Sequence, residues 1–212
     1  IDNFIYENND RIDKIVNEKS EVIIDIDEIS LKGNHNLENV LFIIGIGKIL
    51  NIPNEVISQF LKTTKALEHR LENFFLKQNT LFINDSKGTN VESTIKAIEA
   101  FKNRIVLIAG GENKKICNEE LIKKINERVG FVYLIGETGT ILAEEMNKVG
   151  YKKYKNLGTL EKVLLDIREN IDFEDGQTIL FSPATASFDQ FKNFEERGRI
   201  FKELTNKILG EK

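Results

Sequence analysis

Short apolar runs alternate with longer segments of helical spacing through most of this chain, and this alternation strongly limits the folds it can adopt. Strand followed by helix in a regular series predicts an α/β fold with a doubly wound, mostly parallel sheet flanked by helices. We expect strands at 81–83, 105–108, 131–135, 152–155 and 178–181, and helices at 91–102, 118–128, 139–149, 159–169 and 188–208.

The beginning of the chain has a different pattern. Residues 1–30 hold short β-like runs separated by turns, and apolar helices are expected at about 37–50 and 53–63. The chain starts with Ile1 rather than methionine. We therefore predict two domains, with residues 1–66 as the end of a larger domain and residues 67–212 as an α/β domain.

Composition excludes several classes of partner. The 30 basic and 34 acidic residues leave a net charge of −4, which offers no electrostatic attraction to nucleic acid or to an anionic membrane. No apolar run approaches the roughly 20 residues of a membrane span. The single cysteine, Cys117, excludes an internal disulfide framework and fits a reducing compartment. We expect a cytoplasmic monomer that binds neither nucleic acid nor membrane.

Polar and glycine-rich segments follow three of the predicted strands, at 84–87, 110–114 and 182–187. Ligands of doubly wound sheets bind beyond the carboxyl ends of the strands. The last segment leads directly into a predicted helix, where Ser187 and Gln190 have the spacing of a capping box. Backbone N–H groups at such a helix start suit a carboxylate or a phosphate.

Each of these residues also has a structural interpretation. Thr89 with Glu92 fits a capping box, and asparagines near residue 36 fit a helix start. Isolated lysines are usually solvated, and His69 has no neighbour in sequence to orient it as a base. The joint occurrence of several segments favours the site interpretation.

The segments 33–39, 69–72, 84–90, 110–111 with Lys114, and 182–197 resemble the Mur ligases of peptidoglycan synthesis, in their order and spacing. Within that family they are most similar to the branch that adds D-glutamate to UDP-N-acetylmuramoyl-L-alanine. The resemblance implies a three-domain enzyme, of which this chain would hold the C-terminal part of the ATP-binding central domain (1–66) and a Rossmann-like C-terminal ligase domain (67–212).

The implied activity is ATP-dependent amide formation through an acyl phosphate, in cell-wall biogenesis. The family's phosphate loop, of the form G-x-x-G-K-S/T, does not occur in this sequence, and the family's magnesium ligands would lie mostly upstream. We therefore expect no metal ligand within the chain, and no activity from the chain alone. A related Mur or folylpolyglutamate-type ligase, and a non-catalytic module that binds a nucleotide or an amino acid, are the alternatives.

The resemblance also implies roles for individual residues. Nucleotide contacts would come from Asn36, Asn39, Arg70, Asp85 and Lys87. D-Glutamate would be bound by Thr89, Lys114, Ser187 and the amide of Phe194, with Lys87 and Lys114 in catalytic roles. Lys115 follows Lys114, so which of these two lysines meets the substrate carboxylate stays open.

Overall fold

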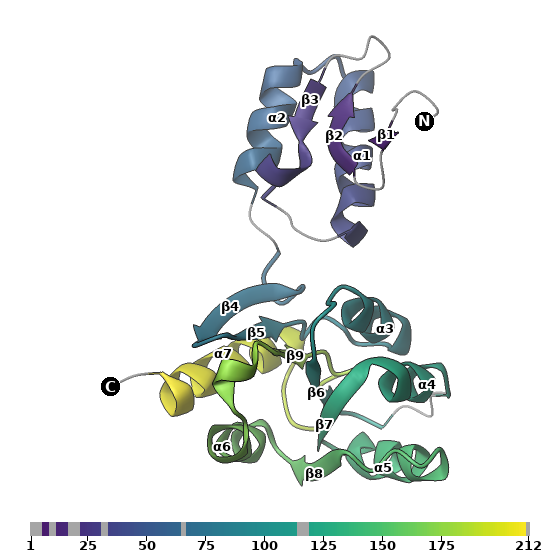
Figure 1. The fold of residues 1–212 in the computed structure, drawn as a ribbon, viewed down its shortest axis with the longest axis vertical. Helices are drawn as coiled ribbons and strands as arrows, with labels where there is room; N and C mark the ends of the chain where they lie inside the picture. The colour runs from purple at the N-terminus through teal and green to yellow at the C-terminus, as the bar shows by residue number, and fades with distance from the viewer. Residues whose placement is uncertain are drawn as a thin grey trace. The chain divides into compact units, whose positions relative to one another are not determined.

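The computed structural model of the chain describes residues 6–8, 12–16, 22–30, 34–64, 67–113 and 119–210. The chain divides into two compact units, Ile1–Ala66 and Leu67–Lys212. Figure 1 shows the elements of the two units as ribbons. Each unit has a hydrophobic core of its own. None of the described helices is long and apolar enough to cross a membrane.

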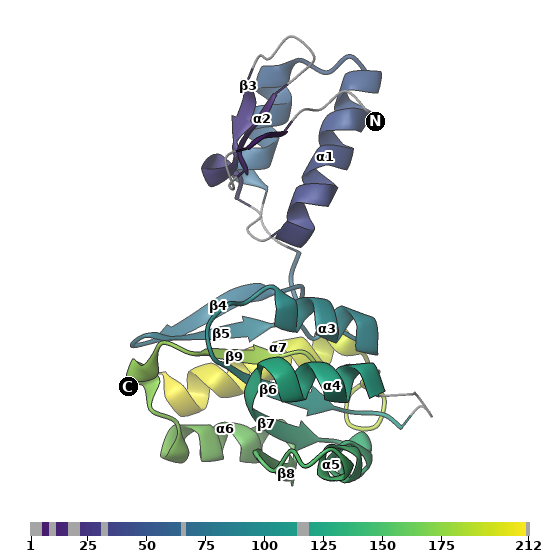
Figure 2. The ribbon, with the colours of Figure 1, turned by 45° about the vertical axis from the view of Figure 1, so that its right-hand side comes forward.

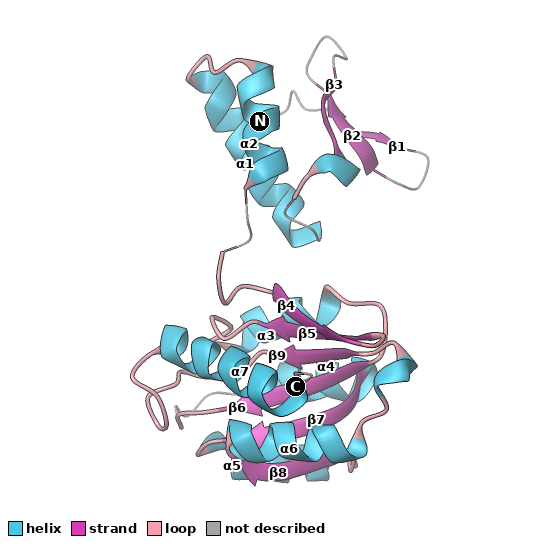
Figure 3. Ribbon diagram, turned by 90° about the vertical axis from the view of Figure 1, so that its left-hand side faces the viewer, coloured by secondary structure: helices cyan, strands magenta, loops and turns pink. Residues whose placement is uncertain are grey.

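The smaller unit combines an antiparallel sheet with two helices (Figure 3). Its elements are β1 (Tyr6–Asn8), β2 (Ile12–Val16), β3 (Val22–Asp25), a 3-10 turn (Ile26–Glu28), α1 (Asn34–Ile49) and α2 (Asn54–Thr63). Ile23 and Ile24 of β3 are buried against apolar side chains of both helices. These contacts make up the core of the unit.

Helix α1 is apolar on more than one face. Val40 and Ile44 are buried in the core, whereas Phe42, Ile46 and Ile49 are 60%, 56% and 80% exposed. A helix that is apolar all round is normally covered on several sides. Helix α1 therefore has an apolar face that the described residues leave uncovered.

The larger unit is built on one six-stranded sheet with the order β4-β5-β9-β6-β7-β8. The parallel strands are β5 (Thr80–Asn84), β6 (Ile105–Gly110), β7 (Val129–Ile135), β8 (Tyr154–Gly158) and β9 (Thr178–Phe181), and β4 (Glu72–Lys77) is antiparallel to β5. The central strands β6 and β9 are buried along their whole length. Continuous apolar runs are typical of strands covered on both faces.

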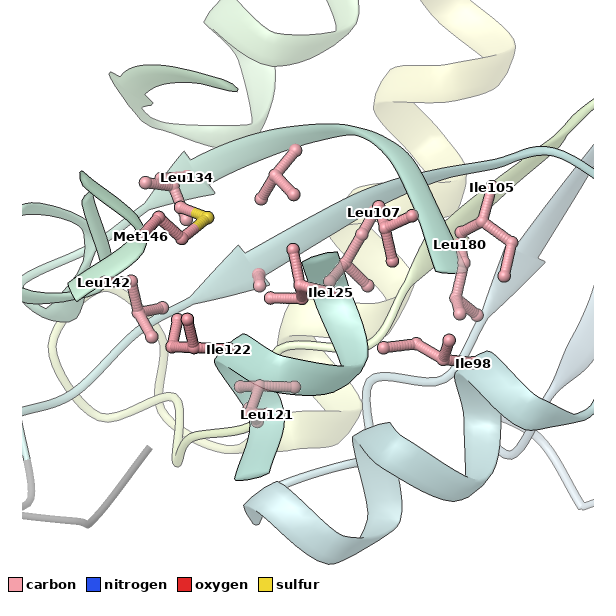
Figure 4. Close-up of a cluster of buried hydrophobic side chains, with 14 of the residues drawn as sticks. Ile98, Ile105, Leu107, Leu121, Ile122, Ile125, Leu134, Leu142, Met146 and Leu180 are labelled. Atoms are coloured by element: carbon pink, nitrogen blue, oxygen red, sulfur yellow. The ribbon is translucent and has the colours of Figure 1, made fainter. Parts of the chain in front are cut away.

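Helices cover both faces of this sheet (Figure 2). Helices α3 (Val91–Glu99), α4 (Glu119–Arg128) and α5 (Thr138–Lys148) pack on one face, and α6 (Leu160–Asn170) and α7 (Phe194–Leu209) pack on the other. Because side chains alternate across a strand, Leu107 of β6 lies in the first core and Val106 and Ile108 lie in the second. Figure 4 shows Leu107 and Leu180 from the sheet among side chains of α3 and α4.

The order of the strands brings three strand ends together. The chain passes from β5 to β6, β7 and β8 with helices on one face, and then returns through α6 to place β9 between β5 and β6. The parallel strands β5, β9 and β6 are therefore neighbours, and their carboxyl ends lie at one edge of the sheet.

The predicted α/β fold with a mostly parallel sheet flanked by helices is confirmed. The sequence pattern does not predict β4, because this edge strand begins with the polar Glu72 and Asn73 and is only partly buried. The last helix begins at Phe194, so the expected start at residue 188 is wrong.

Candidate functional site

Three polar loops meet at the carboxyl edge of the sheet: residues 85–89 after β5, 111–113 after β6 and 182–187 after β9. Backbone hydrogen bonds join them to one another. The Ala184 N–H donates to the Gly88 carbonyl at 2.9 Å, and the Glu112 N–H donates to the Ala186 carbonyl at 3.0 Å. The convergence of the three loops, which the sequence predicts, is therefore confirmed.

A buried arginine of α7 holds two of these loops. The Arg197 side chain is 0% exposed, and its Nη1 donates to the carbonyls of Thr185 and Ala186 at 3.0 and 3.1 Å. Its Nε and Nη2 donate to the hydroxyl and the carbonyl of Ser86 at 3.1 and 2.8 Å. Burial lowers the pKa of Arg197 to about 10, so the guanidinium keeps its charge at neutral pH. One charged side chain thus links the loop after β5 to the loop after β9.

Sequence reasoning did not assign a role to Arg197. A signal was present, because Arg197 lies on the same helical face as Gly198, Phe201 and Thr205, which are all buried. A charged residue at a buried position of an amphipathic helix must find hydrogen-bond partners inside the fold.

The loop after β6 depends on glycine and on a neighbouring turn. Gly110 has a φ of 113°, and a Cβ atom there would overlap the backbone carbonyl of Ile135. Further along, the Asn113 N–H donates to the Glu137 carboxylate at 3.2 Å. These contacts position the chain just before Lys114. Lys114 and the lysine that follows it lie outside the described residues, as does Cys117.

Asp85 is the first residue of the loop after β5 and is 6% exposed. Its Oδ2 accepts from the Ser182 hydroxyl at 2.7 Å, and its Oδ1 accepts from the Leu71 N–H at 3.2 Å. Burial raises the pKa of the Asp85 carboxyl to about 6, although the Ser182 hydroxyl opposes this shift. The carboxylate therefore joins the loop after β9 to the residue next to Arg70. Its contact with a ribose stays a prediction.

Lys87 and Phe194 line a pocket of about 360 Å³, together with Leu67, Glu68, His69, Glu195 and Arg199. The Lys87 side chain is exposed, and its Nζ lies 4.7 Å from the centroid of the Phe194 ring. Within the described part of the chain, no carboxylate lies within ion-pair distance of Lys87. The ammonium therefore keeps its charge available for an anionic group in the pocket.

His69 is buried and belongs to a polar cluster at the start of the larger unit. Its Nδ1 lies 2.9 Å from the Asn84 side-chain nitrogen, and its backbone N–H donates to Glu72 at 3.0 Å. Lys202 of α7 donates to both Glu68 and Glu72, at 2.6 and 2.7 Å. Burial lowers the pKa of His69, which favours the neutral ring. These contacts support the structural interpretation of His69.

The same cluster does not suit magnesium. Among the described residues, one group of side chains lies close enough together to hold a metal ion: Glu68, His69 and Glu72. Lys202 already forms ion pairs with both carboxylates, and magnesium prefers an octahedral shell of oxygen atoms to an imidazole.

The cap of α3 rules out the structural interpretation of Thr89. The Asn90 side chain accepts from the Ser93 N–H at 2.8 Å, so Thr89 and Glu92 do not form a capping box. Asparagine is at least as good an N-cap as threonine. The half-buried Thr89 hydroxyl makes no hydrogen bond with another described residue.

The capping box predicted for Ser187 and Gln190 is also wrong. The N-cap of α7 is Asn193, whose side chain accepts from the Glu196 N–H at 2.7 Å. Ser187 is buried, and its carbonyl accepts from the N–H groups of Gln190 and Phe191 in a turn before the helix. Phe194 is the first residue of α7, where backbone N–H groups have no partner within the helix.

The remaining residues predicted to bind the nucleotide do not belong to the three loops. Asn36 and Asn39 are near the start of α1 in the smaller unit; Asn39 is exposed, and the side chain of Asn36 lies outside the described residues. Arg70 is exposed and directly precedes Leu71, which contacts Asp85. The structure thus brings Arg70, Asp85 and Lys87 into one region of the larger unit.

The fold and the loops at its strand ends define an α/β domain of the kind that binds small molecules at the carboxyl edge of its sheet. Residues 69–185 match the family described as Mur ligase, glutamate ligase domain. The chain belongs to the Mur ligase family.

Curated relatives agree with this assignment. A UDP-N-acetylmuramoylalanine–D-glutamate ligase from Fusobacterium nucleatum is 46% identical over 200 residues, which cover 93% of this chain and 46% of the relative. A UDP-N-acetylmuramoylalanine–D-glutamate ligase from Caldicellulosiruptor bescii is 39% identical, over 98% of this chain and 45% of the relative. The chain thus spans less than half the length of these relatives.

Solved structures share the fold. The ligase MurC from Thermotoga maritima aligns with a TM-score of 0.64 at 14% identity, over 92% of this chain and 42% of that one. MurF from Acinetobacter baumannii aligns with a TM-score of 0.63 at 17% identity, over 89% of this chain and 40% of that one. At such identities the likeness concerns the fold alone.

Proposed function

We propose that this chain is the C-terminal part of an ATP-dependent ligase that adds D-glutamate to UDP-N-acetylmuramoyl-L-alanine in peptidoglycan precursor synthesis. The observation that carries the proposal is Lys87, an ammonium in a pocket beside β5 with no carboxylate in ion-pair distance among the described residues. The names of relatives at 46% and 39% identity support D-glutamate as the amino acid.

The proposed reaction forms one amide bond. A carboxylate oxygen of the alanyl group attacks the γ-phosphorus of ATP, the P–O bond to the β-phosphate breaks and ADP leaves. The D-glutamate amine then attacks the carbonyl carbon of the resulting acyl phosphate. The C–O bond to phosphate then breaks, phosphate leaves with the electron pair, and the nitrogen loses a proton. We assign Lys87 and Lys114 to stabilise the negative charge that develops on the phosphoryl and carbonyl oxygens.

Two carboxylates of D-glutamate need donors at two separate points. We assign Thr89 and Lys114 to the α-carboxylate, and the Ser187 hydroxyl and the Phe194 N–H to the side-chain carboxylate. Two features support these roles: Asn90 caps α3, which leaves the Thr89 hydroxyl available, and the Phe194 N–H is at the positive end of the α7 dipole. Arg197 adds a buried positive charge behind the Ser182–Ser187 loop.

Nucleotide binding is proposed from both units. Arg70 and Lys87 would contact ATP phosphates and Asp85 the ribose, while Asn36 and Asn39 would contact the adenine. We assign residues 1–66 to the C-terminal part of a central ATP-binding domain and residues 67–212 to the ligase domain. The exposed apolar side chains of α1 support the first assignment, because further parts of a larger domain would cover them.

The remaining parts of the proposal concern the whole enzyme. Magnesium would be held mostly by residues outside this chain, since the Glu68–His69–Glu72 cluster does not suit it. We expect the chain alone to be inactive, and the whole ligase to be a cytoplasmic monomer.

The test is phosphate release by the whole ligase that carries this sequence, with ATP, magnesium and UDP-N-acetylmuramoyl-L-alanine. D-Glutamate, L-glutamate and no amino acid are compared, and the chain alone serves as a control. Release that requires D-glutamate, with no release from the chain alone, is the expected result. Release with another amino acid would point to a related ligase, and no release with any amino acid to a binding module.

A further inference from the structure

Lys87 needs something to hold its ammonium in place. Its backbone N–H donates to the His69 carbonyl at 3.0 Å, which fixes only the base of the side chain. The four-carbon stem beyond it is exposed, and a lysine side chain carries up to about 2 kcal/mol of rotamer entropy. A flexible ammonium would lose that entropy when it met a substrate.

The group that faces the ammonium is an aromatic ring. The Lys87 Nζ lies 4.7 Å from the centroid of the Phe194 ring, within the distance of a cation–π contact. The ring packs edge-on against the buried His69 ring, with centroids 6.3 Å apart and planes at 83°. The Phe194 carbonyl accepts from the Ser86 hydroxyl at 2.8 Å. Phe194 is therefore held by fixed elements on two sides.

We propose that the Phe194 ring is a positioning group that holds the Lys87 ammonium ready for a phosphoryl group of the substrate. This role is separate from that of the Phe194 N–H, and it rests on the proposed function of Lys87. A ring attracts a cation through its quadrupole and leaves the net charge in place. A carboxylate in the same position would hold the lysine but cancel its charge, as Glu68 and Glu72 do for Lys202.

The first test measures the contact without any activity. Protons that lie over an aromatic ring shift upfield, so the Hε resonances of Lys87 in this chain are expected upfield of those of solvated lysines. Phe194→Leu removes this shift. The matched control is Phe131→Leu in β7, whose ring pairs with Tyr133 at 5.0 Å, and it leaves the Lys87 resonances unchanged. Lys87 resonances that are the same in Phe194→Leu and wild type overturn the proposal.

The second test measures the consequence in the whole ligase. Phe194→Leu is expected to lower kcat/KM for ATP about two- to fivefold, the factor that corresponds to an exposed cation–π contact. Phe194→Tyr and Phe194→Trp restore it, because both rings attract a cation, and Phe131→Leu has no effect. All these variants keep the backbone N–H of residue 194.

A double-mutant cycle separates positioning from packing. If the ring acts through Lys87, Phe194→Leu causes no further loss in a Lys87→Met background. Losses that add in the double variant overturn the proposal, because they mean that the ring acts independently of the ammonium. If the wild-type ligase releases no phosphate, the proposed function is refuted instead. The resonance shift then tests the contact between the Lys87 ammonium and the Phe194 ring without any activity.

Discussion

Replacing Arg197 with methionine tests whether one buried cation holds the site loops together. Methionine keeps an unbranched stem in the core but removes every donor. Three backbone carbonyls, of Ser86, Thr185 and Ala186, and the Ser86 hydroxyl then lose a hydrogen bond that now measures 2.8 to 3.1 Å. The Ala186 carbonyl keeps the Glu112 N–H as a donor, and the Ser86 hydroxyl still donates to the Phe194 carbonyl. The change therefore leaves the carbonyls of Ser86 and Thr185 without a donor among the described residues.

The magnitude follows from these contacts. A buried acceptor left without a partner lowers the free energy of unfolding by roughly 1–3 kcal/mol. Removing the guanidinium offsets part of this loss, because that charged group no longer has to be desolvated when the chain folds. We expect Arg197→Met to lower the free energy of unfolding by about 3–5 kcal/mol, a large share of the 5–15 kcal/mol typical of a domain. Arg197→Lys restores one charged donor group and is expected to fall in between.

Urea denaturation followed by circular dichroism measures these differences. The control is Arg168→Met on α6, an exposed arginine whose partner Glu169 is 3.8 Å away, and its effect is expected to stay within about 0.5 kcal/mol. An Arg197→Met variant within about 1 kcal/mol of wild type would refute the reasoning, because it would mean that water or backbone movement satisfies the Ser86 and Thr185 carbonyls at little cost.

Three further predictions concern single residues. Because burial raises the pKa of Asp85 from 3.8 to about 6, ionisation opposes folding, so stability should fall by about 3 kcal/mol as pH rises through that interval and stay level above it. Titration of the Asp85 13Cγ resonance gives the midpoint, and Asp85→Asn should remove this contribution to the pH dependence of stability. Asn193→Ala should cost about 1 kcal/mol in urea denaturation and Ser187→Ala clearly less, since only Asn193 caps α7. Gly110→Ala should cost more than about 2 kcal/mol, because a Cβ there meets backbone at a φ of 113°, whereas Gly45→Ala, where a Cβ meets nothing within 4 Å, should be neutral or stabilising. Equal effects at the two glycines would contradict the steric reasoning.

Much of the fold could be predicted from local pattern. The apolar runs at 105–108, 131–135 and 178–181 predict buried strands, and the structure has strands there. The start of the last helix could not be predicted in this way. Ser187 and Asn193 both have capping side chains, and the turn at 188–193, which joins the β9 loop to α7, determines that Asn193 is the cap.

The aromatic residues near that turn show the same limit. Helical spacing of Phe188, Phe191, Phe194 and Phe201 predicts that most of them belong to the core. Phe201 is fully buried, Phe191 and Phe194 are half-buried, and Phe188 is 62% exposed. Spacing predicts a shared face only within a continuous helix, and the helix begins at Phe194.

Local sequence by itself determined the α/β class, the polar loops at the strand ends and the resemblance to the Mur ligases, because backbone hydrogen bonding and apolar periodicity act over a few residues. Only the tertiary structure determined which side chains contact those loops. Arg197 meets Ser86 across 111 positions of sequence, and Lys87 meets a ring of the last helix. Such contacts depend on the position of β9 between β5 and β6, which no local pattern encodes. The order of the strands in the sheet therefore determines that the Lys87 ammonium lies beside an aromatic ring. The residues next to Lys87 in the sequence do not determine this contact.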